Sequence, residues 1–146
     1  MNHEALMTND ERMTKLERRR DDFEDTFWNH DILPVIREEA GEKRAYDLEE
    51  RTTRFGEAII DFAKTIPQSA VTHRIISQLV GAGTSVGANY AEADDAVSKK
   101  EFLKSIGTCK KEAREVKHFL RMAVRASPEL KFQARKLWIE AKELHT

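Results

Sequence analysis

Residues 98–126 read SKKEFLKSIGTCKKEAREVKHFLRMAVRA, and this stretch decides the fold. Apolar or small side chains recur along it every three or four residues, the spacing that turns one stripe of a helix toward its partners. The stretch begins with Ser98 and, three residues later, Glu101, a capping box in which the two residues satisfy free backbone N–H groups. We therefore predict one long helix starting after Ser98. Its core stripe is Phe102, Ile106, Cys109, Ala113, Val116, Leu120 and Ala123.

Three further segments repeat this spacing: residues 48–66, 72–93 and 130–144. Ser69 is placed to cap the start of the second of them, because its hydroxyl can accept a free backbone N–H. Ser127 has the same position before the last segment, and Pro128 follows it at the first helical position, where a missing N–H costs nothing. The chain therefore contains four predicted helices in a row.

The links between these helices are short, so that sequential helices must run antiparallel. A composition with 35% charged residues but only 6 Gly and 3 Pro also favours long helices over a β-sandwich, which needs frequent turns. The predicted fold class is all-α: an antiparallel up-down-up-down four-helix bundle over residues 45–146, preceded by an N-terminal helical extension.

Residues 1–44 form the predicted extension, which we expect to be partly helical. Its apolar side chains include Phe27, Trp28 and Ile32. Two interpretations are open. The aromatic side chains pack against the bundle, or they dock onto another subunit or partner, since an apolar patch of this kind would otherwise stay exposed.

Several classes of protein are disfavoured by the sequence. Cys109 is the only cysteine, so an intramolecular disulfide is excluded, and residues 1–20 are mostly charged and polar, unlike the apolar core of a signal peptide. No stretch has the roughly 18 apolar residues needed to cross a bilayer. The five histidines show no metal-ligand spacing. We expect a cytoplasmic protein with no membrane contact, no metal, no cofactor and no catalytic site.

Residues 78–93 read QLVGAGTSVGANYAEA and contain three glycines inside a predicted helix. Each glycine lowers the stability of a helix by roughly 1 kcal/mol relative to alanine, so a compensating contact is expected. We predict that Gly81, Gly83 and Gly87 allow a neighbouring helix to approach closely. Two alternatives are a glycine-rich turn that splits the helix and a phosphate-binding loop. The phosphate-binding loop is disfavoured, because no strand is predicted before it.

Charge is divided unevenly along the chain. Residues 99–146 contain 13 Lys and Arg against 6 Asp and Glu, whereas residues 1–98 contain 12 against 20. Opposite the core stripe of residues 98–126 lies a row of side chains that are cationic or can become so, and these are candidates for contacting the phosphates of RNA or DNA. A solvated helix face, or contact with an acidic protein surface, is the alternative. The candidates are Lys104, Lys111, Arg114, His118, Arg121 and Arg125.

The run GTSVGAN at residues 83–89, followed by SKKEF at 98–102 and KEARE at 111–115, resembles a family of four-helix-bundle proteins, the 23S rRNA intervening-sequence proteins. The resemblance covers residues 46–125 with the family's order and spacing. Gly81 stands where the family usually has arginine, Glu101 replaces aspartate, and His118 begins a segment that in the family is commonly Tyr-Trp-Leu.

This resemblance implies a homo-oligomer, commonly a pentameric ring. It also implies a relationship to accessory variability proteins of diversity-generating retroelements, whose partners are a reverse transcriptase and nucleic acid. Polar residues of the motif are expected to be buried and paired within the bundle, a small-ligand site being the alternative. They are Thr84, Ser85, Asn89 and Glu92.

We therefore expect a non-enzymatic homo-oligomeric scaffold that engages nucleic acid, or a nucleic-acid enzyme such as a reverse transcriptase, through a basic surface. Two other hypotheses remain. One is a purely protein-binding assembly module that uses residues 1–44, and the other is an enzyme with a pocket near Asn89 and Glu92.

Overall fold

Four long helices account for nearly all of the second part of the chain in the computed structural model, which describes residues 15, 18–19, 27–28 and 47–145. A short 3₁₀ turn, Pro128–Leu130, precedes the last helix. The described residues contain no strand, and the predicted all-α class is confirmed. The helices are α2 (Leu48–Thr65), α3 (Thr72–Asp94), α4 (Lys99–Ala126) and α5 (Lys131–His145).

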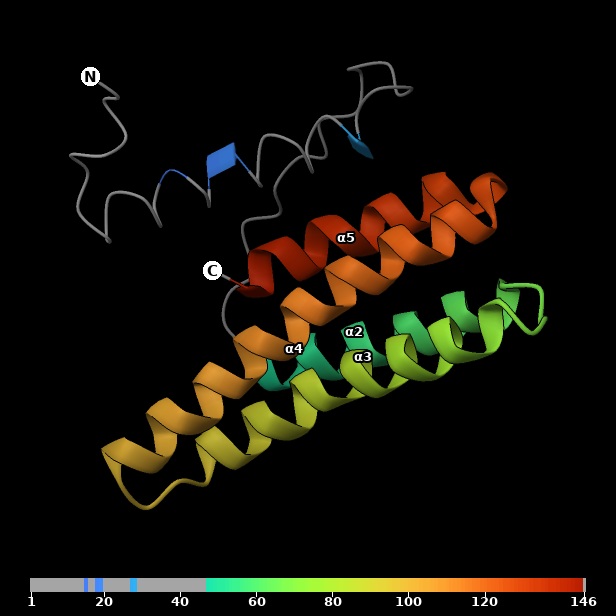
Figure 1. Cartoon of the computed structure of the whole chain (residues 1–146). Helices are drawn as coiled ribbons and strands as arrows, with labels where there is room; N and C mark the ends of the chain where they lie inside the picture. The colour runs from blue at the N-terminus through green and yellow to red at the C-terminus, as the bar shows by residue number, and fades with distance from the viewer. Residues whose placement is uncertain (1–14, 16–17, 20–26, 29–46, 146) are drawn as a thin grey trace, which may run out of the picture. The chain divides into compact units, whose positions relative to one another are not determined.

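The four helices form the predicted antiparallel bundle. Figure 1 shows α2 and α3 as one hairpin and α4 and α5 as a second, with the hairpins lying against each other. The most extensive packing joins α3 to α4, and the packing of α2 on α5 is much less extensive. The bundle is therefore closed on three sides by sequential neighbours and more loosely on the fourth.

Helix starts follow the predicted caps with two differences. At α4, the backbone N–H of Glu101 donates to Ser98 Oγ at 3.2 Å, and the Glu101 carboxylate accepts from Val97 rather than from Ser98. At α3, Ser69 Oγ accepts from the backbone N–H of Thr72 at 3.1 Å. Before α5, Ser127 makes no side-chain cap, because the 3₁₀ turn intervenes.

The core is built from the predicted stripes. Ile59, Leu79, Val116 and Leu120 are fully enclosed, and Trp138 is 3% exposed. Burying an aliphatic side chain of this size stabilises the fold by about 1.5–3 kcal/mol each. The stripes therefore supply most of the free energy that holds the four helices together.

Two glycines let α2 and α3 cross closely, as predicted. A Cβ atom on Gly83 would lie 2.7–2.9 Å from three atoms of Ile59, and one on Gly87 would lie 3.4 Å from the Thr52 carbonyl oxygen. Gly81 has no such contact within the described residues: a Cβ there would meet nothing within 4 Å, because this position faces away from α2. Gly56 on α2, absent from the prediction, completes the crossing, since a Cβ there would lie 3.3 Å from the Gly83 carbonyl oxygen.

The tip of the α3–α4 hairpin extends beyond the ends of α2 and α5, as Figure 1 shows at its lower left. α4 has 28 residues and α5 has 15, which at 1.5 Å per residue is a difference of about 20 Å. The core stripe of α4 continues into this tip without a full set of partners. Phe102 is consequently 42% exposed, Leu103 is 56% exposed, and Ile106 is only half-buried.

Ion pairs connect α2 to α5. The Arg51 guanidinium donates to Glu140 and Glu143, each at 2.5 Å, and the hydrogen bond to Glu140 raises the pKa of Arg51 further. These side chains are partly exposed, so the pairs are worth on the order of 1 kcal/mol or less. They align the two helices more than they stabilise the fold.

The chain separates into two compact units, Met1–Ala40 and Gly41–Thr146. In the first unit the described residues are helical, and the rings of Phe27 and Trp28 meet edge to face at 5.1 Å. The predicted boundary at residues 44 and 45 and the predicted docking residue Ile32 lie outside the described residues. Among the helices that are described, none has the length and apolar character required to span a membrane.

Cys109 is expected to react with a thiol reagent far more slowly in the native protein than in the unfolded chain. Its thiol is buried and lies 3.4 Å from the Val86 carbonyl oxygen, and burial raises its pKa, so little of the reactive thiolate forms. The rate of reaction with a chromogenic disulfide at about pH 8, with and without denaturant, measures this. Equal rates would contradict the buried position.

Candidate nucleic-acid interface

The predicted cationic row runs along the side of α4 that faces away from the core. Because the positions repeat at three and four residues, they share one helix face, while Cys109, Ala113 and Leu120 occupy the opposite one. The structure thus brings all six candidates together on a single stripe. Lys104, Lys111, Arg114, His118 and Arg125 are exposed and Arg121 is half-buried.

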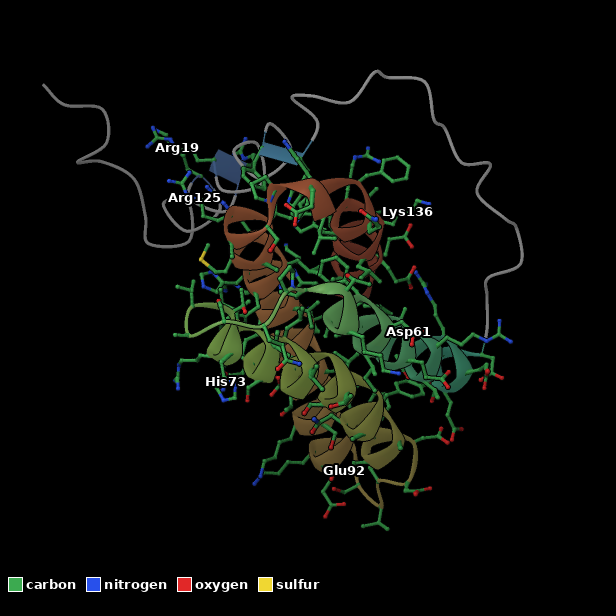
Figure 2. All side chains as sticks on the ribbon, turned by 90° about the vertical axis from the view of Figure 1, so that its right-hand side faces the viewer. Arg19, Asp61, His73, Glu92, Arg125 and Lys136 are labelled. Carbon is green, nitrogen blue, oxygen red and sulfur yellow. The ribbon has the colours of Figure 1, made fainter. Side chains whose placement is uncertain are left out.

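The two hairpins differ in charge. Residues 47–98, which include α2 and α3, contain four Lys and Arg against eight Asp and Glu, whereas residues 99–145 contain 13 against 6. Figure 2 shows Arg125 of α4 on the same side of the molecule as His73 of α3, with Asp61 and Lys136 projecting on the other side. The cationic stripe therefore borders α3.

A groove of about 500 Å³ opens between this stripe and α3. The His118 and Phe119 rings meet there edge to face, with centroids 5.0 Å apart and planes at 81°. The groove combines cations, an aromatic face, one amide and one carboxylate. Its lining side chains are Gln78 from α3 and Lys111, Arg114, Glu115, His118 and Phe119 from α4.

Acidic side chains limit the positive potential of the stripe at one point. Glu112 and Glu115 lie close together on α4, and burial followed by the charge of Glu115 raises the pKa of Glu112 above its ordinary value. An anion approaching α4 is therefore better placed beside Lys111 and Arg114 than beside Glu115.

The polar residues of the glycine-rich motif are not buried in the single chain, and that prediction is wrong. Thr84 and Glu92 are exposed, and Ser85 and Asn89 are half-buried. The side chains of Thr84, Ser85 and Asn89 bond instead to their own helix, because an α3 carbonyl lies one turn back from each donor. Thr84 Oγ1 donates to Val80 O at 2.7 Å, Ser85 Oγ to Gly81 O at 2.7 Å, and Asn89 Nδ2 to Ser85 O at 2.8 Å.

These bonds leave the outer face of α3 lined by small residues whose polar groups are already satisfied. Gly81 and Ala88 are exposed on this face together with Ser77. Within the described residues, no other helix packs against Gly81, although a close approach was predicted there.

Side chains that could bind a metal do not gather anywhere in the part of the chain that the structure describes. Within residues 47–145 and the few described residues before them, no three His, Cys, Asp or Glu side chains come close enough to hold a metal ion. The expectation of no cofactor and no catalytic site stays a prediction.

Gln78, Glu115 and Phe119 are the groove residues that sequence reasoning missed. All three lie beside a helix stripe rather than on it, so periodicity assigned them no role. The replacement of the family's usual Tyr-Trp-Leu by His118-Phe119-Leu120 was the available signal, since it keeps an aromatic pair at this point.

A family model described as 23S rRNA-intervening sequence protein matches residues 44–145. Among solved structures, the chain is similar to that of a protein with unknown function from the S23 ribosomal protein family of Bacteroides thetaiotaomicron. The two are 24% identical, with a TM-score of 0.59 over 67% of this chain and 91% of the other. At this identity the similarity supports the fold alone. No curated protein gives a significant match.

Proposed function

Because this chain belongs to the 23S rRNA-intervening sequence protein family, we propose that it is a non-enzymatic homo-oligomeric scaffold that binds nucleic acid through α4. A nucleic-acid enzyme such as a reverse transcriptase is a further partner in this proposal. The observation that carries it is the exposed cationic stripe from Lys104 to Arg125.

The dimensions of the stripe suit a nucleic-acid backbone. Residues 104 to 125 of α4 span about 30 Å, close to the 34 Å of one duplex turn. Lysine and arginine side chains can follow phosphates over that length, and each contact releases a counterion, which is the main source of non-specific affinity. A merely solvated face has no need to align five Lys and Arg side chains along one stripe of a helix.

The wild-type protein is expected to bind structured RNA and duplex DNA with an affinity that falls steeply as salt rises. Fluorescence anisotropy of labelled oligonucleotides between about 50 and 200 mM salt measures the slope of log K against log salt. Absence of binding to both at about 50 mM salt would contradict the proposal. If deletion of residues 1–44 then abolished capture of a protein partner, the purely protein-binding module would be favoured.

Two different surfaces support the proposed assembly. One is the small-residue face of α3 around Gly81, onto which a second helix can pack at short range. The other is the apolar tip of the α3–α4 hairpin at Phe102 and Leu103, which α2 and α5 do not accompany. Contact between two unlike patches is heterologous, and such contacts close into a ring where the rotation between subunits closes. The pentamer implied by the family resemblance is one such ring.

Gly81→Leu is expected to shift the protein from an oligomer toward the monomer without unfolding it. The substitution adds bulk to the outer face of α3, where it meets nothing inside the chain. Gly107→Leu is the matched control, because this glycine is also exposed on a helix with nothing within 4 Å, but lies on α4. Light scattering measures the mass. A wild-type mass near 16.8 kDa at all micromolar concentrations would contradict assembly.

A further inference from the structure

We propose that the groove between α3 and α4 binds one unpaired base of a single-stranded nucleic acid together with its neighbouring phosphate. This inference rests on the proposed function, and it names the kind of nucleic acid that the surface selects. The occupant is a nucleotide whose base leaves the strand and enters the groove beside the cationic stripe.

The groove has two chemically different sides. Lys111, Arg114 and His118 belong to the stripe and are exposed, whereas Glu115 and Phe119 are half-buried and line the groove with Gln78 of α3. A phosphate is attracted to the cations and repelled by the Glu115 carboxylate. The phosphate therefore occupies the outer side, and the base is directed inward toward α3.

The inner side offers what a free base requires. The half-buried Phe119 ring is aromatic, and the plane of the neighbouring His118 ring lies at 81° to it. Every base has a face that stacks on such a ring. The Gln78 amide can donate and accept at the edge of a base, and the Glu115 carboxylate can accept from an exocyclic amino group.

A duplex cannot use this side of the groove. Its bases are already stacked and paired, so it presents phosphates and would contact the cationic stripe alone. Aromatic side chains beside cations are instead the usual means of holding single strands. The volume of about 500 Å³ lies within the range of small-molecule pockets, so one nucleotide fits.

The test compares three ligands of equal length on the full-length protein at about 50 mM salt. They are a single strand with its bases, an abasic strand with the same sugar and phosphate backbone, and a blunt duplex. Stacking of one base is worth about five- to 150-fold in affinity, so the strand with bases is expected to bind at least about five-fold more tightly than the abasic strand.

Phe119→Leu is expected to remove most of that difference while leaving abasic binding unchanged, because it keeps apolar bulk and removes the aromatic face. Phe132→Leu is the matched control: Phe132 is 52% exposed on α5, outside the groove. Thermal unfolding by circular dichroism verifies that both variants remain folded.

The outcomes separate the two proposals. Equal binding of all three ligands, or an unchanged preference for bases in Phe119→Leu, would overturn the single-strand site and leave the cationic interface standing. If the wild-type protein bound none of the three ligands, the proposed nucleic-acid function itself would be wrong.

Discussion

Gly83→Ala is expected to destabilise the protein by about 1–2 kcal/mol. An added Cβ would lie 2.9 Å from Ile59 Cβ, an atom next to the backbone that cannot rotate away. Overpacking of this kind costs about 1–3 kcal/mol, and the better helix propensity of alanine returns up to about 1 kcal/mol. The overpacking cost exceeds the propensity gain, because α2 and α3 must move apart to relieve the clash. Urea denaturation measures the loss.

Gly81→Ala is the matched control and should have the opposite sign. It lies two residues away on the same helix, but its Cβ would enter open space within the chain, so only the propensity gain of up to about 1 kcal/mol remains in the monomer. Both variants are to be compared with the wild type at one protein concentration, low enough for the protein to be monomeric. Equal changes in the free energy of unfolding for the two variants would contradict the close packing of α2 on α3 at Gly83.

Replacing four cations of the stripe by glutamine is expected to weaken nucleic-acid binding by about a hundred-fold or more at about 50 mM salt. Each lost phosphate contact also lowers the slope of log K against log salt by about 0.9. The helix should persist, since these side chains lie away from the core stripe and glutamine is a good helix former. Anisotropy titrations measure both quantities. The four positions are Lys111, Arg114, Arg121 and Arg125.

A control with the same change in net charge separates the stripe from general electrostatics. Its four positions are exposed and lie outside the stripe: Lys64, Arg74, Lys99 and Lys136. Their replacement by glutamine should reduce affinity much less, because no phosphate contact is lost. Similar losses in the two variants would mean that overall charge, rather than the surface of α4, governs binding.

Much of the fold was predictable because each helix carries its own start signal and stripe. The Ser98 cap, the 28-residue α4 and the buried Leu120 follow from local sequence. The resemblance to the family is likewise confirmed by the match over residues 44–145, while the relationship to retroelement proteins stays a prediction.

Other features depend on how two helices are placed relative to each other. Nothing in the sequence distinguishes Gly83 from Gly81 except position around α3, and Gly56 is informative only once α2 is seen to cross at that point. The exposure of Phe102 has the same origin, because periodicity gives the face of a helix but not the length of its neighbours. The groove beyond the stripe depends on Gln78 of α3 and Phe119 of α4, which line it from two different helices.

The unequal helix lengths also divide the bundle into regions of different local stability. Near Leu120 four helices enclose the core, whereas the α3–α4 tip has two helices and exposed apolar side chains. Segments with fewer buried contacts open at lower free energy than the whole fold. The tip can therefore unwind and re-form while the rest stays folded, so backbone amides around Phe102 should exchange with solvent through local opening. A surface of this kind adjusts to its partner at little cost to the bundle.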